Sequence, residues 1–312
     1  MKELTLSANA VLPVFLMMAA GYLSRRLGVL KREDVSKYNR VAFLVFLPCL
    51  LFYNVYRSDL SAAVNPKLIA YAVAGVLTVF AVAYAVVVRF EPANERRGVL
   101  MQGVFRSNYV ILGLPIAQAL LGENELGPVS VLIAIVVPLF NVLAVFVLER
   151  FRGGNVRPAQ VALQMLKNPL VVSSALGVAA LLIGLKLPTV AEKAVSGLGS
   201  VATPLQLFLL GAFFRFEGLG RYAKALSAVT LVKLVVTPAI FLSLAAALGF
   251  RGVEFVALLG IFASPTAVNS FTMAQQMGGD AELAGDIVVS TSVFSALSMF
   301  GWIFLFKTMG VF

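Results

Sequence analysis

The sequence contains no histidine and a single cysteine, Cys49, and only 13% of its 312 residues are charged. Without histidine there is no histidine-based catalytic triad, no histidine-ligated metal and no histidine proton relay. One cysteine excludes an internal disulfide and a cysteine-ligated zinc site. The apolar segments also lack the pair of aspartates that intramembrane proteolysis uses. We therefore expect no enzyme activity, no metal and no other cofactor.

What the sequence has in excess is apolar residues. They make up 60% of the chain, and the mean hydropathy is +0.93. A chain of this length and composition is typical of an all-α protein that crosses a membrane many times. The net charge of +10 does not predict nucleic-acid binding, because the basic residues cluster between the apolar segments. The lipid bilayer is thus the first partner that the composition predicts.

About ten segments are apolar and long enough to cross a bilayer, which takes about 20 residues. The connections between them are short, and no linker separates a soluble domain. The expected transmembrane helices lie near residues 5–24, 37–56, 67–88, 98–121, 127–148, 160–184, 196–214, 225–248, 253–276 and 286–306.

The loops between these segments differ in positive charge. Fifteen lysines and arginines fall in the loops of one side and seven in those of the other. Because the richer side faces the cytoplasm, both termini are expected outside. The expected location is the inner (plasma) membrane of a bacterium.

Several landmarks recur at an offset close to half the chain length. This predicts two repeats, residues 1–156 and 157–312, with five spans each. An odd number of spans turns the second copy upside down in the membrane. The pairs are Pro13 and Pro169, Pro48 and Pro204, Asn108 and Pro265, and Glu125 and Glu282.

Two stretches interrupt apolar segments at matching places in the two halves. RSNYVILGLP (106–115) contains a cation, polar residues and a Gly-Leu-Pro sequence expected to break the helix, and ASPTAVNS (263–270) is its counterpart. Helices broken at membrane depth occur where the backbone is buried in protein or faces a wet cavity. Such a pair of breaks indicates the binding site of a transporter. We expect the breaks to cross, with Asn108 and Asn269 lining one polar cavity.

The candidate substrate-binding residues come from these breaks and from kinks expected at Pro48 and Pro204. Other roles remain open, since Asn108 could bond only to a neighbouring helix and Arg106 could reach the membrane surface. Lys167 and Lys233 are further cations in apolar surroundings. The candidates are Arg106, Asn108, Tyr109, Gly113, Pro115, Pro265, Thr266, Asn269 and Ser270, with Cys49 and Gln206 beside the kinks.

Four stretches together resemble the auxin efflux carrier family, which includes plant PIN auxin exporters and bacterial malonate and malate permeases. They are SNYVILGLPIAQAL, KNPLVVSSALG, ATPLQLFLLG and ASPTAVNSFTMAQQMGGDAELAGDIVVSTSVFS. The resemblance implies ten helices in two inverted repeats, related to the bile acid sodium symporter fold. It also implies a scaffold domain from spans 1, 2, 6 and 7, a transport domain from spans 3–5 and 8–10, and an elevator mechanism.

In that family the fourth and ninth spans cross at their prolines. The resemblance therefore implies a crossing formed by Asn108, Gly113 and Pro115 with Pro265 and Asn269. The fourth-span stretch often reads Gly-Asn-Thr-Gly in the family, and residues 106–109 depart from it with Arg-Ser-Asn-Tyr.

The sequence thus predicts a secondary transporter of small organic anions, either a dicarboxylate or an auxin-like carboxylate. The alternative is a Na⁺-coupled carrier of bile-acid-like or other amphipathic anions. Carriers coupled to H⁺ or Na⁺ often have a buried carboxylate, and the best candidate here is Asp286 at the start of the last apolar segment. The choice between H⁺ and Na⁺ as coupling ion therefore stays open. A homodimer also stays open. A channel is less well supported, because the chain lacks repeated pore rings.

Overall fold

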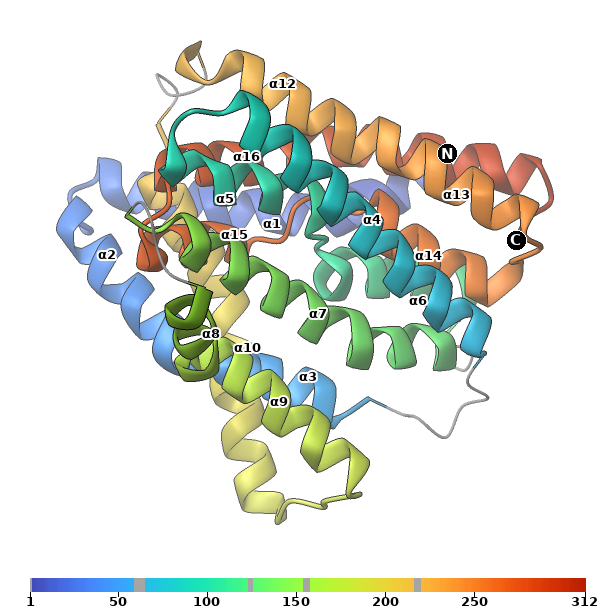
Figure 1. Ribbon diagram of the computed structural model, residues 1–312, viewed down its shortest axis with the longest axis horizontal. Coiled ribbons are helices and arrows are strands. Elements are labelled where there is room, and N and C mark those ends of the chain that lie inside the picture. Colours follow the sequence, from blue (N-terminus) through green and yellow to red (C-terminus); the bar gives the residue numbers. More distant parts are fainter. Residues whose placement is uncertain (1, 59–64, 123–125, 154–157, 216–219) are drawn as a thin grey trace.

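The computed structural model describes residues 2–58, 65–122, 126–153, 158–215 and 220–312. All regular structure in these ranges is helical, and no strand occurs in them (Figure 1). Seven helices of the described part are long and apolar enough to cross a membrane, or eight if a pair bent by 61° forms one span. The expected fold class, an all-α integral membrane protein, is confirmed.

The long spans follow the chain in the order that the apolar segments predict. Some are single helices, and others are helical pieces joined end to end. They are α2, η1 and α3 (Arg32–Val41, Ala42–Phe46 and Leu47–Tyr56), α4 (Pro66–Phe90), α5, η2 and α6 (Asn94–Phe105, Tyr109–Gly113 and Leu114–Leu121), α7 (Gly127–Phe151), α10 (Thr189–Phe213), α12, η4 and α13 (Ala223–Leu231, Val232–Val236 and Thr237–Ala247), and α16 (Ala281–Thr308).

The other expected segments are helical as well, but they are bent, interrupted or outside that set of long spans. The bent pair consists of α8 (Pro158–Lys167) and α9 (Pro169–Leu182). The first expected segment lies in α1 (Lys2–Arg26), and the ninth is divided into α14 (Gly252–Ala263) and α15 (Asn269–Met277).

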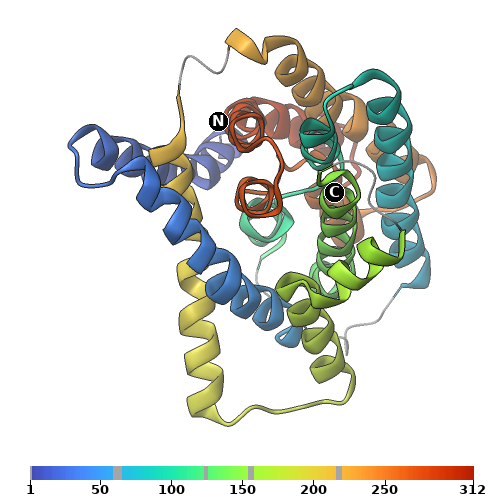
Figure 2. The same ribbon diagram turned by 60° about the vertical axis from the view of Figure 1, so that its left-hand side comes forward.

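Helices α1, α3, α9 and α10 pack on one another, with α1 along α10 and α3 between α9 and α10. In Figure 2 the blue helices and the yellow α10 lie on one side of the molecule, and the teal helices lie on the other. The contact between α1 and α10 is very close at Gly21 and Gly211. A Cβ atom on Gly211 would lie 1.9 Å from the Met18 carbonyl oxygen, and one on Gly21 would lie 1.8 Å from that of Phe208. Glycine therefore lets the two helix backbones touch.

Three π-helical turns in the described part, η1, η2 and η4, each end two residues before a proline. Proline lacks an N–H, and its ring clashes with the carbonyl four residues earlier. In each turn the residue before proline donates its N–H to the carbonyl five residues back, which widens the helix where the clash would occur. The three bonds run from Leu47 to Ala42, from Leu114 to Tyr109 and from Thr237 to Val232, ahead of Pro48, Pro115 and Pro238.

The prediction that Gly113-Leu114-Pro115 breaks the helix is therefore wrong in position. The chain is helical through η2 and α6, and the interruption lies earlier, between Phe105 and Tyr109. Arg106 is extended there, with φ −75° and ψ 140°. The second interruption follows Ala263, where Ser264 is extended with φ −66° and ψ 150°.

The two interruptions meet through their main chains. The N–H of Asn108 donates a hydrogen bond to the carbonyl oxygen of Pro265 at 2.8 Å. The bond supplies partners to two backbone groups that the broken helices leave open. Residues 157 positions apart in the sequence are thus adjacent in space, at a point where neither segment is helical.

Candidate functional site

A small cavity of about 70 Å³ lies beside this contact. Its wall comes from both interruptions, from α3, from the middle of α7, and from α10 just before and after Pro204. A ligand site for a drug-sized molecule is typically about 300–1,000 Å³. In this conformation the cavity therefore suits a compact ligand. Its polar lining residues are Asn54, Arg106, Ser107, Asn108, Tyr109, Asn141, Thr203, Gln206 and Asn269.

Arg106 supplies a positive charge to this cavity. Its side chain is only 2% exposed, so it does not reach the membrane surface. The guanidinium donates to the side-chain oxygens of Gln102 at 3.1 Å and Asn141 at 2.9 Å, and it contacts the sulfur of Met273 at 2.7 Å. None of these partners carries a charge, and no carboxylate among the described residues forms an ion pair with Arg106.

Two helix N-termini also face the cavity. The helix formed by η2 and α6 begins after Asn108, and α15 begins at Asn269. The first N–H groups of a helix lack intrahelical acceptors, and the helix dipole places a partial positive charge there. Such termini bind anions readily. Together with Arg106 they give the cavity a positive character.

Unpaired amide groups add to this character. The Nδ2 group of Asn108 and the Nε2 group of Gln206 are buried and have no hydrogen-bond partner among the described residues. Both residues line the cavity, one from the first interruption and the other from α10. A buried donor without an acceptor costs about 1–3 kcal/mol. An oxygen-rich ligand would relieve that cost.

The cavity brings together five of the residues chosen from the sequence, namely Arg106, Asn108, Tyr109, Gln206 and Asn269. The expected juxtaposition of Asn108 and Asn269 is confirmed as a feature of the structure. Whether these residues bind a substrate stays a prediction.

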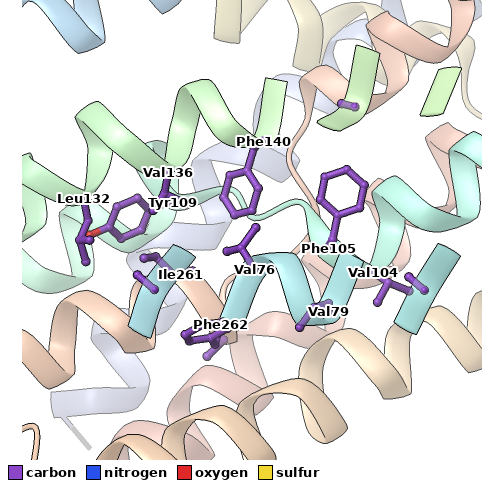
Figure 3. Close-up of a cluster of buried hydrophobic side chains, with 14 of the residues drawn as sticks. Val76, Val79, Val104, Phe105, Tyr109, Leu132, Val136, Phe140, Ile261 and Phe262 are labelled. Atoms are coloured by element: carbon purple, nitrogen blue, oxygen red, sulfur yellow. The ribbon is translucent and has the colours of Figure 1, made fainter. Parts of the chain in front are cut away.

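The aromatic ring of Tyr109 belongs to the apolar core. Figure 3 shows the ring beside Leu132, and the hydroxyl donates to the carbonyl of Val129 at 3.4 Å. The ring packs where Gly113 meets Gly260, because a Cβ on either glycine would lie 2.6 Å from a ring carbon. Gly113 therefore serves close packing behind the cavity rather than its lining.

The remaining candidates of the second interruption lie next to the cavity without lining it. The Pro265 carbonyl accepts the Asn108 N–H. The Thr266 hydroxyl donates to the carbonyl of Gly103 at 2.7 Å. Ser270 is buried, and its hydroxyl has no partner among the described residues.

Two candidates lie further from the cavity lining. Pro115 is exposed on α6, and Cys49 is partly buried on α3 next to Leu50, which does line the cavity. Of the two other cations, Lys167 is exposed at the end of α8, whereas Lys233 is 1% exposed inside η4.

The sequence did not predict that α7 forms part of the site. Asn141 is fully buried there, holds Arg106 and faces the cavity. In the sequence it is only a polar residue in an apolar span, and asparagines that hydrogen-bond between helices have the same appearance. Thr203 gave no stronger signal, whereas Asn54 follows the kink expected at Pro48 and lines the cavity.

Comparison with known proteins identifies the family of the chain. One relative, named "Putative malonate transporter" in Rhizobium meliloti, is 27% identical over 99% of this chain and 97% of its own length. An uncharacterized transporter of Methanocaldococcus jannaschii is 24% identical over 95% of this chain and 98% of its own, and one of Methanothermobacter thermautotrophicus is 26% identical over 95% and 97%. The family described as "Membrane transport protein" matches residues 6–303. The chain therefore belongs to this family of membrane transporters, the auxin efflux carrier family that its motifs resemble.

Proposed function

We propose that this protein is a secondary transporter of small organic anions and that it binds a carboxylate in the cavity beside the Asn108–Pro265 contact. The observation that carries the proposal is the buried charge of Arg106. Removing an ion from water costs several kcal/mol, and neutral hydrogen-bond partners offset only part of that cost. A bound carboxylate would supply the missing negative charge and could accept the N–H groups of the two helix ends.

The substrate that fits best is a compact carboxylate such as a short dicarboxylate. The volume of about 70 Å³ favours a compact ligand over a bile-acid-like or other amphipathic anion. A relative named for malonate is consistent with this size. Within this proposal the unpaired amide groups of Asn108 and Gln206 would donate hydrogen bonds to the carboxylate oxygens. Asn269 would contact the substrate from the second interruption.

We propose that transport follows an elevator mechanism between two inverted five-helix repeats. The scaffold would consist of α1, α2–α3, α8–α9 and α10, and the remaining helices would carry the site. The mutual packing of α1, α3, α9 and α10 and the equivalent positions of the two interruptions support this division. The scaffold wall of the cavity, including Gln206, would then stay in place while the Arg106 side moves.

The distribution of positive charge among the loops bears on the membrane and the orientation of the protein. The excess of lysine and arginine on one set of loops supports a location in the inner membrane of a bacterium with both termini outside. A homodimer is compatible with this arrangement. The proposal does not depend on whether H⁺ or Na⁺ is the coupling ion of the transport cycle.

Purified protein tests the proposal. Malonate, malate, other dicarboxylates and indole-3-acetate are screened for thermal stabilisation, and the best ligand is then used in proteoliposome uptake. We expect Arg106→Met to weaken binding at least about tenfold, because it removes a charge-assisted hydrogen bond. Asn108→Ala and Asn269→Ala should also lower uptake. Gln160→Ala, at an exposed position on α8, is the control.

Wild-type uptake by both asparagine variants would remove this site from consideration. Absence of stabilisation and uptake with every carboxylate of the screen would reject the organic-anion assignment itself.

A further inference from the structure

Two side-chain amides hold the guanidinium of Arg106. The Nη1 group donates to Gln102 Oε1 at 3.1 Å, and the Nη2 group donates to Asn141 Oδ1 at 2.9 Å. Gln102 is 1% exposed and Asn141 is completely buried. The Nη1 group also contacts Met273 Sδ. Each nitrogen at the end of the side chain therefore has a neutral acceptor, and within the described part of the chain only Nε lacks a partner.

The usual buried partner of arginine is a carboxylate, which matches the guanidinium geometry and cancels its charge. Asparagine and glutamine present a carbonyl oxygen at the same distance from the backbone as aspartate and glutamate do. They orient the guanidinium equally well but leave its charge uncompensated.

Resting on the proposed function, we infer that Gln102 and Asn141 are positioning residues whose neutrality keeps the Arg106 charge available to the anion. They fix the direction of the guanidinium before the substrate arrives. The substrate carboxylate is then the first negative charge that the cation meets inside the protein.

The guanidinium of Arg106 has only donors, so the oxygen of Asn141 is the atom that faces it. The Nδ2 group of Asn141 then points to the hydroxyl of Ser174 on α9, to which it donates at 3.4 Å. Gln102 lies one helical turn before Arg106 on α5 and does not line the cavity, whereas Asn141 does. Gln102 thus binds the guanidinium from outside the cavity lining, and Asn141 binds it from within the lining.

The test replaces each amide by the acid of the same shape, in Asn141→Asp and Gln102→Glu. Each variant would form a buried ion pair with Arg106. The apparent melting temperature without ligand should therefore stay level or rise, while malonate, used as the probe, should bind on the order of tenfold to a hundredfold more weakly. A structural role alone would predict the opposite pair of results, with lowered stability and unchanged affinity.

Arg106→Gln provides the second arm. In that background Asn141→Asp has no cation to pair with, so the same substitution should lower the apparent melting temperature. This reversal of sign between the two backgrounds measures the coupling between positions 106 and 141 directly. It requires no ligand, so it also tests the inference if the wild-type protein does not bind malonate.

An equal stability change in both backgrounds would overturn the inference. So would acid variants that bind malonate as tightly as the wild-type protein does, or failure of both acid variants to fold, since pairing with Arg106 must stabilise them. Failure of the wild-type protein to bind or transport any carboxylate would instead reject the proposed function.

Discussion

Replacing Gly211 by alanine tests whether α1 and α10 touch as closely as described. The added Cβ atom would lie 1.9 Å from the Met18 carbonyl oxygen, 2.5 Å from its carbonyl carbon and 2.7 Å from its Cα. All three are backbone atoms, so no side-chain rotation relieves the contact. An ordinary contact begins near 3.4 Å, and the helices must therefore separate by about 1.5 Å at this point.

The cost follows from the packing lost along the contact. A radial gap of 0.5–1 Å already removes about a quarter to a half of the dispersion energy of an atom pair. Insertion of extra atoms into a packed interior typically costs about 1–3 kcal/mol. Because the obstructing atoms are rigid, we expect Gly211→Ala to cost about 3 kcal/mol, at the upper end of that range.

The assay is the apparent melting temperature in one detergent, followed by far-ultraviolet circular dichroism. Gly197→Ala on the same helix is the matched control, because its Cβ would meet no atom of the described residues within 4 Å. Alanine favours a helix over glycine by about 1 kcal/mol, so the control should be neutral or slightly more stable. Equal melting temperatures for the two variants would refute the close approach of α1 and α10.

Three further predictions concern the site and its surroundings. Gly260→Ala should lower both uptake and melting temperature, at a cost of about 1–3 kcal/mol, because its Cβ would lie 2.6 Å from the Tyr109 ring at the start of η2; unchanged uptake would contradict this. Asp280→Asn should lower the melting temperature by weakening the bonds from Arg96 at 3.2 Å and from the Tyr222 hydroxyl at 2.9 Å, together worth about 1–3 kcal/mol, with circular dichroism as the measurement. Replacing Na⁺ by K⁺ in proteoliposome uptake distinguishes the two coupling ions: a Na⁺-coupled carrier should lose uptake, whereas unchanged uptake would exclude Na⁺ coupling.

The sequence predicted the two interrupted segments because polar residues within apolar spans are rare and costly. The structure places Asn108 and Asn269 on one cavity wall, as that prediction expects. The sequence could not place Asn141 beside Arg106, because that contact depends on how α7 rotates against α5. Local periodicity leaves that rotation undetermined.

The misplacement of the first interruption has a different physical cause. Pro115 was expected to end a helix, yet the preceding Leu114 donates its N–H five residues back and the helix continues. A π-helical turn thus accommodates proline at the expense of one irregular turn. The sequence alone does not distinguish this outcome from a break.

The hydrogen bond between Asn108 and Pro265 uses only main-chain atoms, so it does not depend on the asparagine side chain, and proline at position 108 would remove its donor. Because Asn108 is buried, side chains no larger than asparagine fit there while the junction of the two segments is retained. Under the proposed function, a panel of small substitutions at position 108 would therefore alter substrate selectivity while the junction of the two segments is kept.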